Sequence, residues 1–250
     1  FADGASLSRL LDGGDGDGKN LVNLSALTTA VSVAQGDQAG ADLRIANIGE
    51  VVANEAIVDS NWLWASTQNN QWSISGANKG SLNDSLIFNG FANLRGGNAD
   101  DHFIFRSTGK LSGQIDGGGH VDGDMVDYAS LIDEFIVDLS GSADLVNIER
   151  LIGNEKITLR GPDQSAIWRI REGKDQGRIS YSPSQELNFS GVSKLQGGNA
   201  SDEFIFAAGA SVTNGVNGGA GADHFIVELS GSTTSHTTLL VGGEGGEGDT

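Results

Sequence analysis

The chain contains no cysteine, so a disulfide framework, a thiolate metal site and a cysteine nucleophile are all excluded. Proline is nearly absent, with 2 residues in 250, whereas glycine accounts for 38. Glycine accepts the positive φ angles of tight turns, and proline does not. The composition is therefore typical of short strands joined by many tight, glycine-based corners.

Basic side chains are also scarce: 15 Lys and Arg stand against 33 Asp and Glu, which gives a formal charge of −18. A surface of this sign repels phosphodiester backbones and anionic lipid head groups, so no nucleic-acid partner is expected. The same acidic load suits divalent cations that prefer oxygen ligands. Calcium is the cofactor that the composition favours.

Long hydrophobic runs are absent as well. We find no stretch of about 18 apolar residues, so no membrane insertion is expected, and no charged-then-apolar leader. The apolar fraction of 38% is nevertheless sufficient for a hydrophobic core. Because the chain ends within a motif, we expect it to be a segment of a longer protein.

What the sequence does contain is an internal repeat of about 100 residues. FANLRGGNADDHFIF (91–105) and VSKLQGGNASDEFIF (192–206) agree at 9 of 15 positions, and NIGEVVANEAI (47–57) likewise matches NIERLIGNEKI (147–157). Self-similarity at a fixed period indicates a repeat architecture. It predicts two repeat units, 1–104 and 105–205, and a partial third, 206–250.

A finer period lies within each repeat, because Gly-Gly pairs recur 21 or 24 residues apart, at Gly96 and Gly117 and at Gly197, Gly218 and Gly242. That spacing fits one coil of two or three short strands. Apolar residues two apart, such as Phe103 and Phe105, favour strands over helices. We therefore predict an all-β, right-handed parallel β-solenoid of the β-helix or β-roll type. Tandem immunoglobulin-like sandwiches, also about 100 residues each, are the alternative.

The Gly-Gly corners carry the candidate metal site. GGAGADHFI (218–226) fits the nonapeptide G-G-x-G-x-D-x-U-x at every fixed position, and GGNADDHFI and GGNASDEFI depart from it only at the third glycine. Glycines allow carbonyl oxygens to converge while an aspartate supplies charge, which is calcium chemistry. Stacking would pair Asp101 with Asp122 or Asp124, and Asp202 with Asp223. The plainer alternative is that these aspartates cap backbone amides in ordinary turns. The predicted metal residues are Gly97, Gly198, Gly219, Gly221, Asp101, Asp122, Asp124, Asp202 and Asp223.

These motifs resemble the glycine-rich calcium repeats of the repeats-in-toxin type, and more closely the repeats of about 100 residues in very large bacterial secreted and surface proteins. The segments GGNADDHFIF, KLSGQIDGG, NIERLIGN and QWSI or IWRI carry the resemblance, which covers nearly the whole chain. The resemblance implies an adhesin-like, matrix or spacer segment, secreted or on the bacterial cell surface, as in biofilms. Its partners would be the flanking repeats of the same parent protein. In this chain the nonapeptides are isolated rather than consecutive, which implies fewer calcium ions than in a repeats-in-toxin roll.

Two other functions remain as alternatives. Trp62 and Trp64 alternate in NWLWAS and are candidate residues of a platform for cell-surface or matrix glycans. The competing interpretation is a core position, because in the sequence comparison Trp168 occupies roughly the place of Trp62 in the next repeat. Abundant carboxylate pairs raise the second alternative, a β-helical polysaccharide lyase or epimerase. These aspartates are flanked by glycine and recur as turns, so we expect a structural or adhesive protein and not an enzyme.

Overall fold

The computed structural model describes residues 10–16, 20–36, 38–140, 144–182, 185–228 and 238–243. This part of the chain is all-β, as expected, with large parallel and mixed sheets and one short 3-10 helix, η1 (Glu55–Ser60). Within these ranges no helix has the length and apolar character needed to cross a membrane.

The chain divides into two compact units. Unit 1 comprises residues 1–131 and 146–148, and unit 2 comprises 132–145 and 149–250. Strand β15 (Leu145–Val146) contains one of the points at which the chain passes between them. The repeat limits at 104 and 205 describe sequence similarity and remain a prediction.

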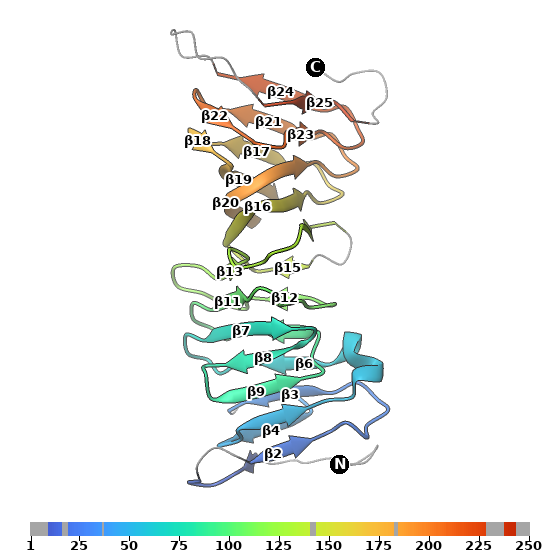
Figure 1. Cartoon of the computed structure of the whole chain (residues 1–250), viewed down its shortest axis with the longest axis vertical. Coiled ribbons are helices and arrows are strands. Elements are labelled where there is room, and N and C mark those ends of the chain that lie inside the picture. Colours follow the sequence, from blue (N-terminus) through green and yellow to red (C-terminus); the bar gives the residue numbers. More distant parts are fainter. Residues whose placement is uncertain are drawn as a thin grey trace. The chain divides into compact units, whose positions relative to one another are not determined.

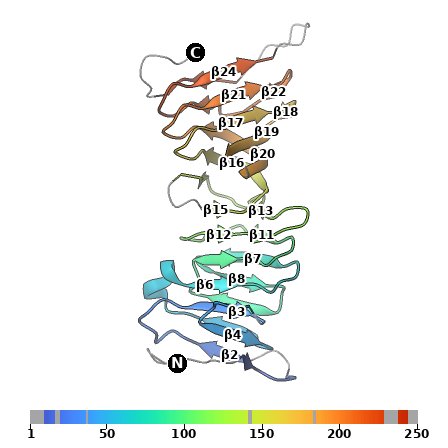
Figure 2. The ribbon, with the colours of Figure 1, turned by 180° about the vertical axis from the view of Figure 1, so that it is seen from behind.

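The described part of unit 1 contains strands of two sheets, which are labelled in Figures 1 and 2. The first sheet has the order β1 (Leu11–Asp12), β4 (Leu43–Ala46), β3 (Ser32–Gln35), β6 (Trp62–Trp64), β10 (Asn93–Arg95) and β12 (Ile115–Asp116). The second has the order β2 (Leu21–Asn23), β5 (Glu50–Val52), β9 (Leu86–Asn89), β8 (Lys79–Leu82), β7 (Gln71–Gly76), β11 (His102–Phe105) and β13 (Met125–Asp127).

Unit 2 has one large sheet and one small one. The large sheet runs β16 (Arg150–Arg160), β20 (Gln185–Gln196), β19 (Gln176–Ser182), β17 (Ile167–Ile170), β21 (Glu203–Phe206) and β24 (His224–Val227). Strand β14 (Phe135–Asp138) pairs with β16, and β23 (Val216–Asn217) pairs with β20 and β25 (Leu240–Val241). The small sheet consists of β18 (Gly173–Lys174) and β22 (Ala210–Ser211).

Strand pairing is mostly parallel, and in the pairs that join successive Gly-Gly corners the offset between partners reproduces the glycine period. Leu94 pairs with Ile115, 21 residues later, and Val216 pairs with Leu240, 24 residues later. The offset is larger where the chain inserts an antiparallel hairpin, which the sequence reading did not predict. These hairpins are formed by β7, β8 and β9 in unit 1 and by β17, β19 and β20 in unit 2. Immunoglobulin-like sandwiches, in contrast, consist of antiparallel strands.

Alternating side chains of these strands form buried rows along each unit. Val33, Leu63 and Leu94 are in register on three neighbouring strands, and each is fully buried. In the second sheet of unit 1, Trp72 stacks on Phe103 with ring centroids 5.6 Å apart. Such rows bury apolar area between successive strands, which is the main stabilising contribution in a repeat fold.

The aromatic row corrects one sequence expectation. In unit 2 the ring of Trp168 stacks on Phe204 at 5.4 Å, as Trp72 stacks on Phe103. Both indole rings also meet a phenylalanine edge, from Phe88 and Phe189 respectively. Trp168 is therefore the counterpart of Trp72 and not of Trp62, because the hairpin, which the sequence comparison overlooked, fixes the register.

Candidate functional site: stacked glycine corners

The Gly-Gly corners stack on one another within each unit, as their spacing predicts. In unit 1 the amide of Gly96 donates to the carbonyl of Asp116, the residue before Gly117, at 2.8 Å. In unit 2 the amides of Gly197 and Gly218 donate in the same way to Asn217 and Val241, each at 2.8 Å. The corner at Gly242 therefore belongs to this stack.

Close approach of backbone explains why glycine is needed in these corners. A Cβ atom on Gly198 would overlap the carbonyl oxygen of Pro162, and one on Gly219 would overlap that of Gly198. Gly219 also has a φ of +97°, which an L side chain rarely adopts. The corners are thus held together by direct backbone contact between successive turns.

The motif aspartates are turned into these corners and are almost fully buried. The carboxylate of Asp202 accepts the amide of Gly198 at 2.9 Å within its own corner and the amide of Ala166 at 2.8 Å. Asp101 does the same in unit 1, where it accepts from Gly97 at 2.6 Å and from Asn70 at 2.8 Å. Each carboxylate therefore fastens its own glycine turn to a neighbouring segment.

A second aspartate continues each row. The amide of Asp101 donates to Asp124 at 2.7 Å, and the amide of Asp202 donates to Asp223 at 2.9 Å. Asp124 and Asp223 have no solvent-exposed surface. Of the two candidate partners of Asp101, the structure selects Asp124, because Asp122 is exposed.

Burial makes these carboxylates unusual acids. Desolvation raises the pKa of Asp202 to about 6, outweighing the hydrogen bonds from Gly198 and Ala166 that act to lower it, and the charge of Asp223 raises it further. Burial raises the pKa of Asp101 as well. A carboxylate with a raised pKa is a negative charge held in an unfavourable place, which a nearby cation would stabilise.

Comparison with known sequence families, curated proteins and solved structures finds no match. The role of the corners is therefore inferred from their chemistry and geometry.

The donor set of the corners fits calcium in type. It consists of buried carboxylates and the backbone carbonyls of the glycine turns, all hard oxygen ligands. Two of the predicted carbonyl ligands already accept hydrogen bonds: Gly97 from Gly119 at 3.0 Å, and Gly198 from Ala220 at 2.9 Å. A carbonyl oxygen has a second lone pair, so these hydrogen bonds do not exclude a metal ligand. The aspartates also perform the amide-capping role that was the plainer expectation.

Sequence reasoning overlooked one residue of the corner, the position before the motif aspartate. One carboxylate oxygen of Asp100 accepts the amides of Val121, Asp122 and Gly123 at 2.8, 2.8 and 3.0 Å. These three hydrogen bonds lower the pKa of Asp100. In unit 2 the hydroxyl of the equivalent Ser201 accepts the amide of Ala222 at 3.0 Å. The sequence signal for Asp100 was the two-residue insertion in the corner after Gly117. The insertion adds backbone amides, and a carboxylate accepts more of them than the serine hydroxyl of unit 2 does.

The aromatic candidates Trp62 and Trp64 lie on the opposite side of β6 from the buried Leu63 and are themselves half-buried. The guanidinium of Arg95 lies 5.0 Å from the ring centroid of Trp64, a cation–π contact. Arg95 also forms an ion pair with Asp116 at 3.4 Å. One ring that a sugar would need for stacking is thus already packed by an arginine, and glycan binding here remains a prediction.

Proposed function

We propose that this chain is a structural or adhesive repeat segment of a large bacterial secreted or cell-surface protein. In this proposal it is a right-handed parallel β-solenoid that acts as a rigid, calcium-stabilised spacer or adhesin rod, and its partners are the flanking repeats of the same protein. The parallel pairings at coil-like offsets within each unit support the solenoid. The resemblance to repeats of giant exoproteins supports the setting.

The observation that carries the proposal is the repetition of one corner in both units. In each unit the carboxylate of a buried aspartate accepts the amide of its own Gly-Gly turn. The backbone amide of the same aspartate donates to the carboxylate of the next aspartate in the row. Catalytic sites are built once, from groups that differ in role, whereas this arrangement recurs with the same roles. Recurrence of one contact from repeat to repeat is typical of stacked repeat proteins, in which each repeat packs on its neighbours.

Calcium is the part of the proposal that the buried charge favours. Asp101 with Asp124, and Asp202 with Asp223, would hold the ion together with the corner carbonyls. The ion would supply positive charge where burial disfavours carboxylates. An ion that binds only the folded state raises the free energy of unfolding by mass action.

Calorimetric melting in EDTA and in millimolar calcium tests this. We expect calcium to raise the melting temperature of the wild type, and this increase to shrink when Asp124 and Asp223 are both replaced by asparagine. Asp133→Asn is a matched control, because Asp133 is an exposed carboxylate of unit 2 in the loop before β14. Equal melting temperatures of the wild type in EDTA and in calcium would remove calcium from the proposal. Small-angle scattering of the monomer tests the rod separately, and a globular particle would refute it.

A further inference from the structure

Unit 1 contains a pocket of about 360 Å³ between η1 and the tip of the β7–β8 hairpin. It is lined by Glu55 and Val58 of η1 and by Ala77, Asn78 and Lys79 at the hairpin tip. Glu55, Ala77 and Lys79 are exposed. The pocket is therefore open to solvent and carries one acidic and one basic group.

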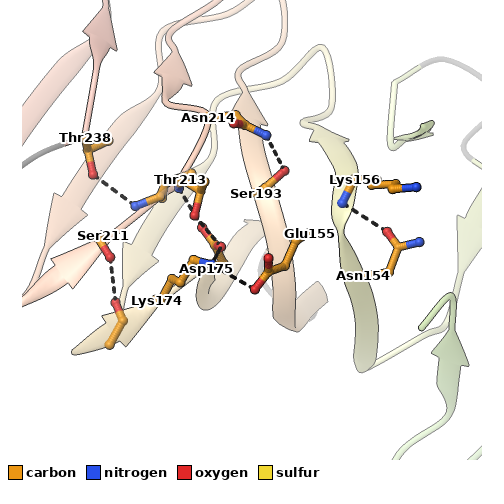
Figure 3. A network of polar contacts seen from close by, with 12 residues as sticks. Asn154, Glu155, Lys156, Lys174, Asp175, Ser193, Ser211, Thr213, Asn214 and Thr238 are labelled. Carbon is orange, nitrogen blue, oxygen red and sulfur yellow. Dashed lines mark hydrogen bonds and ion pairs between the residues drawn. The ribbon is translucent and has the colours of Figure 1, made fainter. Parts of the chain in front are cut away.

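The same place can be identified in unit 2, because the hairpin tips correspond residue by residue. Asn78 and Asp175 both have left-handed backbones, with φ of 53° and 56°. Asn78 accepts the amide of Ser112 at 2.9 Å, and Asp175 accepts the amide of Thr213 at 2.6 Å (Figure 3). Lys174, the residue before Asp175, is thus the counterpart of Ala77.

The acidic wall corresponds as well. Asn54 accepts the amide of Ala56 at 2.8 Å, and Asn154 accepts the amide of Lys156 at 3.0 Å. The residue between the members of each pair is a glutamate, Glu55 in unit 1 and Glu155 in unit 2. The two glutamates are therefore equivalent positions of the repeat.

The two units differ in what faces this glutamate. In unit 2 the ammonium of Lys174 lies 2.8 Å from the carboxylate of Glu155 and 3.7 Å from that of Asp175 (Figure 3). In unit 1 alanine stands at the lysine position, and Glu55 forms no ion pair with any described residue. By this correspondence, an ammonium group of unit 2 pairs with the glutamate whose counterpart lines the pocket in unit 1, although Glu55 belongs to η1 and Glu155 lies within β16 with a φ of 64°.

We propose that the pocket of unit 1 binds small primary ammonium compounds, with the Glu55 carboxylate pairing with the ammonium group as Glu155 does with Lys174. The amide of Asn78 takes the position of the Asp175 carboxylate beside it. Lys79, whose counterpart in unit 2 is the neutral Gln176, adds a positive charge to the pocket wall. The positive charge of Lys79 would pair with a carboxylate on the same ligand, so ω-amino acids are the preferred class.

Titration of the full chain with γ-aminobutyrate, butylammonium and butyrate, followed by ¹H–¹⁵N NMR in EDTA, tests this inference. Exposed ion pairs are weak, so dissociation constants of about 1 to 10 mM are expected for γ-aminobutyrate. The shifted amides should be those near Ala77, Asn78 and Gly90. Butylammonium should bind several-fold more weakly, and butyrate should not bind at the same amides. EDTA keeps the result independent of calcium at the corners.

Two variants decide the outcome. Ala77→Lys should fill the pocket with its own ammonium and should abolish binding while leaving the fold intact, because residue 77 is exposed. Glu55→Gln should abolish binding, whereas Asp133→Asn should not change it. The inference is overturned if no amide near the pocket shifts with γ-aminobutyrate, if butyrate binds equally well, or if Ala77→Lys and Glu55→Gln bind like the wild type.

Discussion

Replacing Asp202 by alanine removes one buried carboxylate and leaves two backbone amides, those of Gly198 and Ala166, without their acceptor. Asp202 is only 2% exposed, so water cannot easily take the place of the carboxylate. The amide of Asp202 itself keeps its bond to Asp223, since that bond uses backbone. The substitution therefore isolates the capping function of the side chain.

A buried amide that loses its hydrogen-bond partner costs about 1 to 3 kcal/mol, so two such amides cost about 2 to 6 kcal/mol. The variant also removes a carboxylate whose raised pKa marks an unfavourable buried charge, which offsets part of this loss at neutral pH. We expect a net loss of about 2 to 4 kcal/mol, or roughly 10 °C in melting temperature for a unit of this size.

Urea unfolding followed by tryptophan fluorescence measures this loss. Unit 2 contains a single tryptophan, Trp168, while Trp62, Trp64 and Trp72 belong to unit 1. The transition of Trp168 should shift to lower urea in Asp202→Ala and stay unchanged in Asp133→Ala, a substitution at an exposed site of the same unit. A loss below about 0.5 kcal/mol, the usual range for surface substitutions, would refute the capping role.

Three further predictions concern pH, glycine and the aromatic row. The folded-state pKa of Asp202, about 6, lies above its ordinary value of 3.8, so its contribution to stability is full below pH 3.8 and is lost as pH rises through about 6. In EDTA the free energy of unfolding of the wild type relative to Asp202→Asn should therefore increase from pH 7 to pH 5, and a constant difference would contradict the burial argument. Gly219→Ala should cost more than 2 kcal/mol because its Cβ meets the Gly198 carbonyl, whereas Gly14→Ala, also at positive φ but facing open space, should cost about 1 kcal/mol; equal losses in urea unfolding would argue against backbone contact. Trp168→Ala should cost about 3 to 5 kcal/mol by calorimetry and Trp64→Ala clearly less, since only Trp168 is fully buried; the reverse order would contradict the assigned core.

Much of the architecture is readable from local patterns. The alternation in HFIF and EFIF predicts strands with Phe103 and Phe204 buried, and both are buried. The spacing of Gly-Gly pairs predicts which corners stack. The antiparallel hairpins were missed because their strands, such as Gln71–Gly76 and Leu86–Asn89, have the same period of two as the parallel ones. Pairing direction depends on distant contacts that no local pattern encodes.

The candidate site was predictable in its residues but not in its details. The motif placed Asp101 and Asp202 in the corners, and their spacing to the next Gly-Gly pair indicated a stacked partner. It did not decide between Asp122 and Asp124, since the insertion after Gly117 allows either register, and only the amide contacts of Asp100 fix the loop. Asn70 and Ala166 were missed because these two amide donors lie immediately before β7 and β17, where no Gly-Gly motif marks the sequence.

Asparagines stand at some positions of the corner rows, and they help to explain why other positions carry a charged aspartate. Asn70 occupies the step before Asp101, and its side chain donates both to that carboxylate and to nearby carbonyls. Asn20, in the corner that starts at Gly13, bonds the Gly13 carbonyl at 2.9 Å. An amide side chain also accepts a corner amide without a buried charge, as Asn217 does from Gly219 at 3.0 Å. Capping alone does not require Asp101, Asp124, Asp202 and Asp223 to be acids, and burial makes the charged form of Asp202 costly. A cation that binds the folded corners would remove this cost, which is the reason to test calcium at these four positions.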